Sequence, residues 1–207
     1  MSDQGLRERK KRRTRVLIAE TAARLFAERG YENVSMTDVA RAAEVAEQTV
    51  YNYFRTKERL VLDLEEPLQD RLADLIRSRP AQLTPAAAIR GEALAFVESI
   101  RSLPPEQIRG GLGRLAVLSP AVRRLSLEMT ERMADALAAV IADTTGLDRW
   151  SSGLQGIALA WVFHTVTEET GRMSQDGRTA AEIADALVPV VTVMLDHLDT
   201  WTGGQPR

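Results

Sequence analysis

The stretch 35–60 constrains the fold of this chain more than any other part, because it reads as two short helices and the start of a third. Ser35, with Asp38 three residues later, has the spacing of a capping box, so a helix is predicted to begin at Met36. An apolar stripe of valine and alanine follows on one face of this helix. Small residues let a second helix approach closely, so we expect a tight pair of short helices here.

The second short helix, predicted over 47–54, has two contrasting faces. Val50 and Phe54 are four residues apart and are expected to form its buried edge. Its other face carries amides and hydroxyls without net charge, namely Gln48, Thr49, Asn52 and Tyr53. A solvated helix in a chain rich in Arg and Glu normally carries charges, so this face favours contact with base edges in a major groove. The pair therefore indicates a helix-turn-helix, and the alternative is an ordinary helical hairpin.

Residues around this pair are expected to bind phosphate groups. Tyr51 and Tyr53 can place phenol hydroxyls against phosphates, and Lys57 stands in the first turn of the next helix, where its ammonium and the backbone N–H groups can clamp one. The run 7–15 holds seven cations in nine residues. It predicts a phosphate or minor-groove arm, and the alternative is a solvated, disordered tail. The predicted DNA-binding residues are Arg12, Arg13, Ser35, Met36, Thr37, Gln48, Thr49, Tyr51, Asn52, Tyr53 and Lys57.

This part of the chain resembles the DNA-binding domain of the TetR family of transcriptional regulators. The family pattern is an aromatic helix end with Gly, a capped helix, and then Thr-hydrophobic-Tyr-x-Tyr/His-Phe-x-x-Lys-Glu-x-Leu. The matching residues are Gly30-Tyr31, Ser35 and 49–60. The chain departs from the pattern at Glu44, where the family usually has Gly in the turn, and at Ala46, where Ser usually caps the second helix.

The resemblance implies a head that binds DNA, residues 1–56, and a larger helical body for effector binding and dimerisation, residues 57–207. It also implies a ligand-responsive repressor that releases a palindromic double-stranded DNA operator when a small molecule binds the body. A dimeric binding or adaptor protein without DNA affinity is an alternative, and only Glu44 and Ala46 favour it.

Charge is divided unequally along the chain, whose net charge is −2. Residues 1–60 carry 13 Lys+Arg against 9 Asp+Glu, a balance of +4, so the remainder carries −6. An acidic body attached to a basic head orients the molecule near DNA, since only the head is attracted to phosphate. The chain has no cysteine, no signal-peptide pattern and no apolar run of about 20 residues. We therefore expect a cytoplasmic protein that does not enter a membrane.

The rest of the chain reads as successive helices, and no segment alternates with period two, so an all-α fold is predicted. Pro67 predicts a kink or break near Glu66 in a helix over about 57–79, and the alternative is that Pro67 starts a new helix. Cap and proline signals begin two further helices at Thr84 and Ser119. The expected helices are about 14–29, 36–43, 47–54, 57–79, 85–103, 105 onward, 120–145, 148–171 and 179–201.

The last two helices are apolar over more than one stripe. A terminal helix with apolar residues most of the way round needs cover on both sides, and a twofold dimer through a four-helix bundle supplies it. The alternative is burial within one chain. The predicted homodimer residues are Ile157, Leu187, Val190, Val191, Met194 and Leu195.

A small-molecule pocket is expected in the middle of the chain, where Pro and Gly interrupt the helices and leave imperfect packing. The candidates are Phe96, Arg114, Leu118, Met129, Met133, Trp161 and His164. Plain core, or a solvated side chain for Arg114, is the alternative for each. The head also resembles a TetR subgroup whose bodies accept acyl-CoA-like effectors, which implies a hydrophobic or acyl-type ligand.

An enzyme is the alternative from another class. His164 and Glu168 lie one turn apart and suit an acid/base pair or two metal ligands. A catalytic metal usually has three protein ligands, and the spacing offers no third. The chain also lacks a cysteine nucleophile, a Gly-rich phosphate loop and a Gly-x-Ser-x-Gly elbow. We therefore predict no catalytic residue, no metal and no cofactor.

Overall fold

The computed structural model describes residues 3–61 and 66–203, and the backbone of these residues is helical apart from short connections. No strand occurs within those two ranges, as the all-α prediction requires. The elements are α1 (Asp3–Arg29), η1 (Tyr31–Asn33), α2 (Met36–Ala42), α3 (Glu47–Tyr53), α4 (Lys57–Val61), α5 (Glu66–Ser78), α6 (Pro85–Ile100), α7 (Pro105–Gly110), α8 (Leu112–Leu118), α9 (Pro120–Thr145), α10 (Arg149–Gln175) and α11 (Ala180–Gly203).

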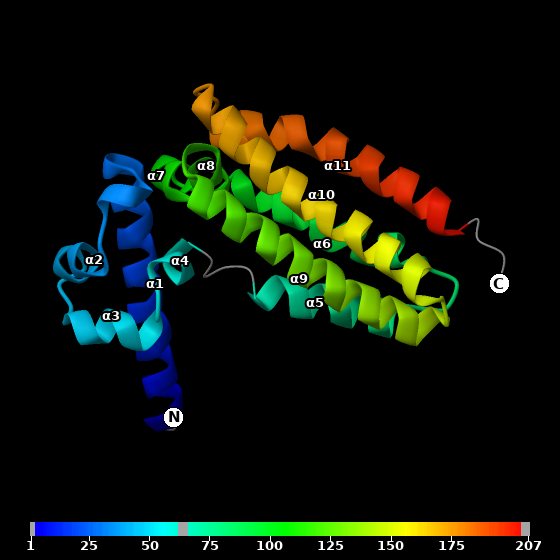
Figure 1. Cartoon of the computed structure of the whole chain (residues 1–207), viewed down its shortest axis with the longest axis horizontal. Coiled ribbons are helices and arrows are strands. Elements are labelled where there is room, and N and C mark those ends of the chain that lie inside the picture. Colours follow the sequence, from blue (N-terminus) through cyan, green and yellow to red (C-terminus); the bar gives the residue numbers. More distant parts are fainter. Residues whose placement is uncertain (1–2, 62–65, 204–207) are drawn as a thin grey trace.

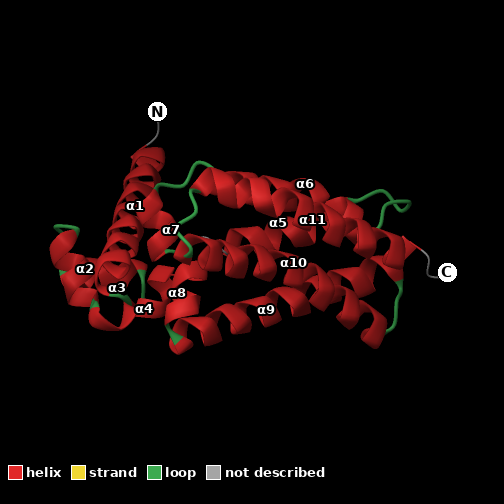
Figure 2. Cartoon of the chain, turned by 90° about the horizontal axis from the view of Figure 1, so that it is seen from above, coloured by secondary structure: helices red, strands yellow, loops and turns green. Residues whose placement is uncertain are grey.

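The helices form two groups (Figure 1). The head, α1 to α4, lies at one end of the molecule, and the long helices of the body run away from it (Figure 2). The short helices α7 and α8 lie between the two groups. No helix in the described part of the chain has the length and apolar character needed to cross a membrane.

Side-chain caps begin the helices where the sequence predicts them. Ser35 Oγ accepts a hydrogen bond from Asp38 N at 3.1 Å, and Asp38 Oδ2 accepts one from Ser35 N at 2.9 Å, which completes the capping box of α2. Thr84 caps α6, Ser119 caps α9 and Asp148 caps α10. Each cap satisfies backbone N–H groups that would otherwise have no partner in the first turn.

The first helix is longer than expected. α1 begins at Asp3 rather than near Thr14, which corrects the predicted helix start and makes the described part of the basic run helical. The contact of Arg12 and Arg13 with DNA stays a prediction. Thr14 lies within a turn of this helix and donates a hydrogen bond to the Lys10 carbonyl at 3.1 Å. Lys and Arg are good helix formers, and α1 continues upstream through them.

The connection between head and body also differs from the expected single helix. α4 ends at Val61 and α5 begins at Glu66, while 62–65 lie outside the described residues. Pro67 is the second residue of α5, which matches the alternative that this proline begins a helix. A proline in the first turn costs no helical hydrogen bond, so the predicted kink or break near Glu66 is a helix start and not a bend inside a continuous helix.

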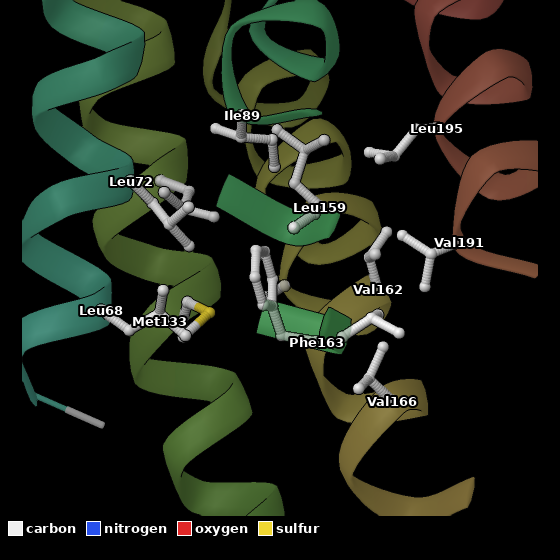
Figure 3. Packing of buried hydrophobic residues seen from close by; sticks show 14 of the residues in the cluster. Leu68, Leu72, Ile89, Met133, Leu159, Val162, Phe163, Val166, Val191 and Leu195 are labelled. Carbon is white, nitrogen blue, oxygen red and sulfur yellow. The ribbon is translucent and has the colours of Figure 1, made fainter. Parts of the chain in front are cut away.

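Two apolar clusters form the core. The head cluster lies among α1 to α4 and includes Phe26, Val50 and Phe54, with Leu115 of α8 and Val122 of α9 completing it. The body cluster joins α5, α6, α9, α10 and α11, and Figure 3 shows part of it. Because α8 and α9 contribute to the head cluster, the head is packed against the body.

The contacts around α7 and α8 are made through glycines. A Cβ on Gly110 of α7 would lie 1.8 Å from the carbonyl oxygen of Ala23 in α1. A Cβ on Gly113 of α8 would lie 2.0 Å from the carbonyl oxygen of Thr167 in α10. The α7–α8 segment therefore touches the head on one side and the body on the other, backbone against backbone.

Candidate nucleic-acid interface and ligand cavity

The turn between α2 and α3 keeps a tight geometry in spite of its unusual sequence. Glu44 has φ 55° and is the one non-glycine residue with positive φ in the described ranges. Val45 N donates to Ala40 O at 3.0 Å and closes the turn. A left-handed backbone at a residue with a Cβ is strained, which is the physical reason for a glycine at such a position. The chain therefore keeps the turn and accepts strain at Glu44.

The start of α3 is fixed by backbone groups. Ala46 has φ −64° and ψ 144° and offers no side-chain cap. Its carbonyl accepts hydrogen bonds from Thr49 N at 2.8 Å and Val50 N at 3.3 Å. The helix begins at Glu47, so the missing serine cap does not displace it.

The two faces of α3 separate as predicted. Val50 and Phe54 are buried, at 0% and 1% exposure. Gln48, Tyr51 and Asn52 are exposed, whereas Thr49 and Tyr53 are partly buried. Gln48 Nε2 donates a hydrogen bond to Asn52 Oδ1 at 3.1 Å, so the two amides act as one unit.

Residues beside α3 frame this surface. Ser35 and Thr37 are exposed at the start of α2, but the Met36 side chain is only 7% exposed and belongs to the head core. That corrects its predicted role, because periodicity does not reveal that the first turn of α2 points inward. Arg15 of α1 lies with its guanidinium carbon 5.1 Å from the centre of the Phe54 ring, so the helical basic run flanks the end of α3.

Lys57 is held against an aromatic ring. Its ammonium lies 4.0 Å from the centre of the Tyr31 ring, a cation–π arrangement. Burial lowers the pKa of Lys57, and the carboxylates of Glu32 and Glu58 act in the opposite direction. Burial, then the charges of Glu58 and Glu32, raise the pKa of Tyr31, whose hydroxyl donates to Glu58 at 3.4 Å. The cation is therefore positioned at the first residue of α4.

Glu32 also links the head to the body. Ser119 Oγ donates a hydrogen bond to Glu32 Oε1 at 2.6 Å and accepts one from Val122 N at 3.4 Å. Ser119 is 3% exposed and caps α9. A single buried hydroxyl thus connects η1 of the head to the first turn of α9.

The body contains a small cavity between α5, α6, α9 and α10, about 20 Å³ in volume. Three predicted residues, Phe96, Met133 and His164, line it. Figure 3 shows Leu68, Met133 and Phe163 close together between their helices. The lining residues not predicted are Leu68, Ser126, Thr130, Ala160, Phe163 and Thr167. Ser126, Thr130 and Met133 have the i, i+4, i+7 spacing of one helix face, a signal that the sequence offered.

The other predicted effector residues lie outside the cavity lining. Leu118 and Trp161 are 55% and 46% exposed, and Met129 is buried away from the cavity. Arg114 lies in α8, with its Nη1 atom buried and without a hydrogen-bond partner. These residues do not line the cavity, and a helical repeat alone does not tell which apolar face meets it. Their contact with an effector stays a prediction.

His164 is the polar centre of the cavity. Its Nδ1 lies 3.1 Å from Thr130 Oγ1, and its Nε2 lies 3.6 Å from Glu168. Burial lowers the pKa of His164, the carboxylate of Glu168 opposes this shift, and Arg123 adds to it. Thr130 Oγ1 donates to the Ser126 carbonyl at 2.9 Å, so its lone pair is left to accept a hydrogen bond from the His164 Nδ1–H group. No group of three or more potential metal-ligating side chains occurs in the part of the chain that the structure describes.

An exposed apolar stripe runs along α10. Trp150, Leu154, Ile157 and Trp161 follow the helical repeat and are 77%, 56%, 54% and 46% exposed. On α11, Val190 and Val193 are 42% and 52% exposed. Of the residues predicted to form a dimer, Ile157 and Val190 therefore lie on the surface.

The remaining predicted dimer residues are covered by their own chain. Leu187, Val191 and Leu195 are each 0% exposed, and Met194 packs beside them against the body cluster. Figure 3 shows Val191 and Leu195 pointing from α11 toward α10. Ion pairs fix α11 to α6, with Arg90 2.7 Å from Asp196. The interface prediction is corrected at these positions, since the apolar residues of α11 meet α6 and α10 of the same chain.

Comparison with known proteins identifies what the head is similar to. Residues 18–64 match the model of the bacterial regulatory proteins of the tetR family. The HTH-type transcriptional regulator TcmR of Streptomyces glaucescens is 32% identical over 148 residues, which cover 70% of this chain and 66% of TcmR. The chain thus spans slightly less than two thirds of that relative.

Solved structures share the fold over most of the chain. Native NalD of Pseudomonas aeruginosa, the secondary repressor of the MexAB-OprM multidrug efflux pump, has a TM-score of 0.55 at 18% identity, covering 89% of this chain and 97% of NalD. The repressor FadR of Thermus thermophilus, solved with lauroyl-CoA, has a TM-score of 0.50 at 20% identity, covering 93% and 96%. TcmR, to which the chain is 32% identical, is a transcriptional regulator, which favours regulation over the catalytic alternative.

Proposed function

We propose that this chain is a member of the TetR family of bacterial transcriptional regulators and, within it, a dimeric, ligand-responsive repressor. The head, residues 1–56, binds a near-palindromic operator, and the body, residues 57–207, dimerises and binds the effector. A regulator of this kind acts on chromosomal DNA, so we place it in the cytoplasm.

The observation that carries this proposal is the α3 surface. An exposed face of amides and hydroxyls stands on a buried apolar edge, and Glu44 holds the turn before it at positive φ. Base edges are read by such groups, whereas phosphates are bound by cations and hydroxyls at the periphery. Because the turn keeps its geometry, Glu44 and Ala46 no longer favour an adaptor without DNA affinity.

A second copy of the chain is the proposed cover for the α10 stripe. Trp150, Leu154 and Ile157, together with Val193 of α11, expose apolar surface that a twofold axis would bury as a four-helix interface. The two copies of α3 then meet successive major grooves on one side of the DNA. The half-sites of the operator are therefore expected about 34–36 Å apart or at a multiple of that distance.

The effector site is proposed at the cavity around His164. A cavity of about 20 Å³ has room for roughly one water molecule, so a ligand has to separate α5, α6, α9 and α10 to enter. Apart from neutral His164 the lining has no ionisable side chain. This favours a ligand with an apolar body and one hydrogen-bonding edge, which includes a hydrophobic or acyl-type molecule.

Binding to the DNA beside the protein's own gene tests the proposal. The full-length protein should shift this fragment more readily than random duplex. Gln48→Ala should reduce that preference by about 1–3 kcal/mol at one base pair, whereas Lys57→Ala should weaken all duplexes alike and lower the salt slope by about one. Equal loss on specific and random DNA for Gln48→Ala would contradict the base-reading role of α3, and no shift of any duplex would contradict repression itself.

A further inference from the structure

The recognition surface of α3 lacks the side chains that read guanine. The exposed residues of α3 are Glu47, Gln48, Tyr51 and Asn52, and the helix contains no Lys or Arg. Guanine presents two acceptors, O6 and N7, in the major groove, and Arg or Lys is its usual partner. The carboxylate of Glu47 is an acceptor only, so it repels both guanine atoms.

The hydrogen bond between Gln48 and Asn52 selects what remains available to a base. Gln48 Nε2 donates to Asn52 Oδ1 at 3.1 Å, which leaves the Gln48 carbonyl as an acceptor and the Asn52 amino group as a donor. If both amides are turned round, one acceptor and one donor again remain. The shared unit therefore offers a donor beside an acceptor in either arrangement.

Adenine is the base that matches this unit. Its N7 accepts a hydrogen bond and its N6 donates one, so the amide pair satisfies both atoms. Guanine itself presents two acceptors side by side and no donor, so a unit that reads this single base leaves its free carbonyl without a partner unless it reaches across to the cytosine N4 amino group. Beside the pair, Thr49 is partly exposed and has a methyl group suited to contact the methyl of thymine.

We infer that the operator half-site presents A·T pairs to α3 and that the joined amides of Gln48 and Asn52 read an adenine. The inference rests on the proposed function, because α3 has to enter the major groove. The inference goes beyond that function because it assigns which bases, A·T pairs, α3 contacts. Arg41 and Arg55 are exposed just outside α3, so any guanine that either of them reads lies at a different position of the half-site.

Selection of binding sites from a random duplex pool with the full-length protein tests the inference. The positions that face α3 are those whose base preference changes in Asn52→Asp and in Gln48→Arg. Asn52→Asp keeps the shape of the side chain and removes its donor, so the preference for adenine at its position should fall about tenfold. Gln48→Arg should replace adenine by guanine there. Arg41→Ala and Arg55→Ala are the matched controls and should leave this position unchanged.

The possible outcomes separate the inference from the function. Enrichment of a palindrome with A·T at the affected positions supports both. Enrichment of a palindrome with G·C at those positions overturns the inference and leaves repression standing. Failure of the wild-type protein to enrich or shift any duplex overturns both.

Discussion

Glu44 combines a side chain with a backbone conformation that suits glycine. Its φ of 55° places its Cβ in a crowded position, and such strain costs on the order of 1–3 kcal/mol. Glu44→Gly should therefore raise the free energy of unfolding by about 1 kcal/mol. This is the lower end of the range, because glycine also gives the unfolded chain more conformational freedom. Urea denaturation measures this difference.

Glu44→Ala is the control for charge, since it removes the carboxylate and keeps the Cβ. Glu44→Ala should therefore show little of the increase in the free energy of unfolding expected for Glu44→Gly. If the Gly and Ala variants were equally stable, the carboxylate and not the backbone would be the source of the difference.

His164 should make the stability of the body depend on pH. Burial lowers its pKa in the folded protein, so the unfolded chain binds the proton more readily. The stability that comes from neutral His164 is present above the unfolded pKa of about 6.5 and is lost as the pH falls below it. Denaturation at pH 7 and pH 5 should therefore show a larger loss for the wild type than for His164→Gln. Equal losses would mean that another group causes the acid sensitivity.

Single residues were predictable where they have a local role. The capping box of Ser35 and the buried edge of Val50 follow from short-range rules and are confirmed. Met36 and Val191 were assigned to surfaces and lie in cores. A helical repeat shows that a face is apolar, but the element that covers this face is a property of the whole fold.

The order of the helices was predictable because several of them carry start signals, but α4 with α5, and α7 with α8, were each expected as one helix. Thr84 and Ser119 begin α6 and α9 where their cap chemistry indicates. The boundary near Glu66 was indicated by Pro67, whereas the start of α1 at Asp3 was not predicted. The cavity was predicted only in part, because its lining comes from four helices that meet through tertiary packing.

Gly110 sets how closely α7 approaches the head. A Cβ there would fall 1.8 Å from the Ala23 carbonyl oxygen, so Gly110→Ala has to push α7 and α1 apart. We expect this variant to lose DNA affinity about tenfold or more while the body keeps its helices. Shift assays and circular dichroism measure the two effects.

Gly91 provides the matched control, since a Cβ on this residue of α6 meets nothing within 4 Å. Gly91→Ala should keep DNA affinity and raise stability by about 0.5–1 kcal/mol through helix propensity. Unchanged DNA affinity in Gly110→Ala would mean that the α1–α7 contact is not needed to position the head.

At the scale of the molecule, the cavity and the head share a physical connection. Thr167 lines the cavity, and its carbonyl oxygen lies against Gly113 of α8. A ligand that moves α10 at Thr167 therefore also moves the α7–α8 segment, which contacts α1 of the head. A hundredfold loss of DNA affinity requires about 2.7 kcal/mol of differential binding, and operator DNA then weakens effector binding by the same factor.

The α10 stripe gives the test of assembly. Ile157→Glu places a carboxylate on surface that is 54% exposed in one chain and buried in the proposed dimer. An unpaired buried charge costs several kcal/mol, so this variant should sediment as a folded monomer and lose operator binding. Leu83→Glu, at a similarly exposed apolar residue before α6, should remain dimeric. A dimeric Ile157→Glu protein would place the interface elsewhere.

The exposed indoles also make the molecule an optical reporter of its own assembly. All three tryptophans, Trp150, Trp161 and Trp201, lie on α10 and α11 with at least 38% of their surface open to water, and the head contains none. Indole emission moves to shorter wavelength when the ring leaves water. Dilution of the protein should therefore shift its tryptophan emission to longer wavelength as the subunits separate. DNA bound at the head should leave this emission wavelength almost unchanged.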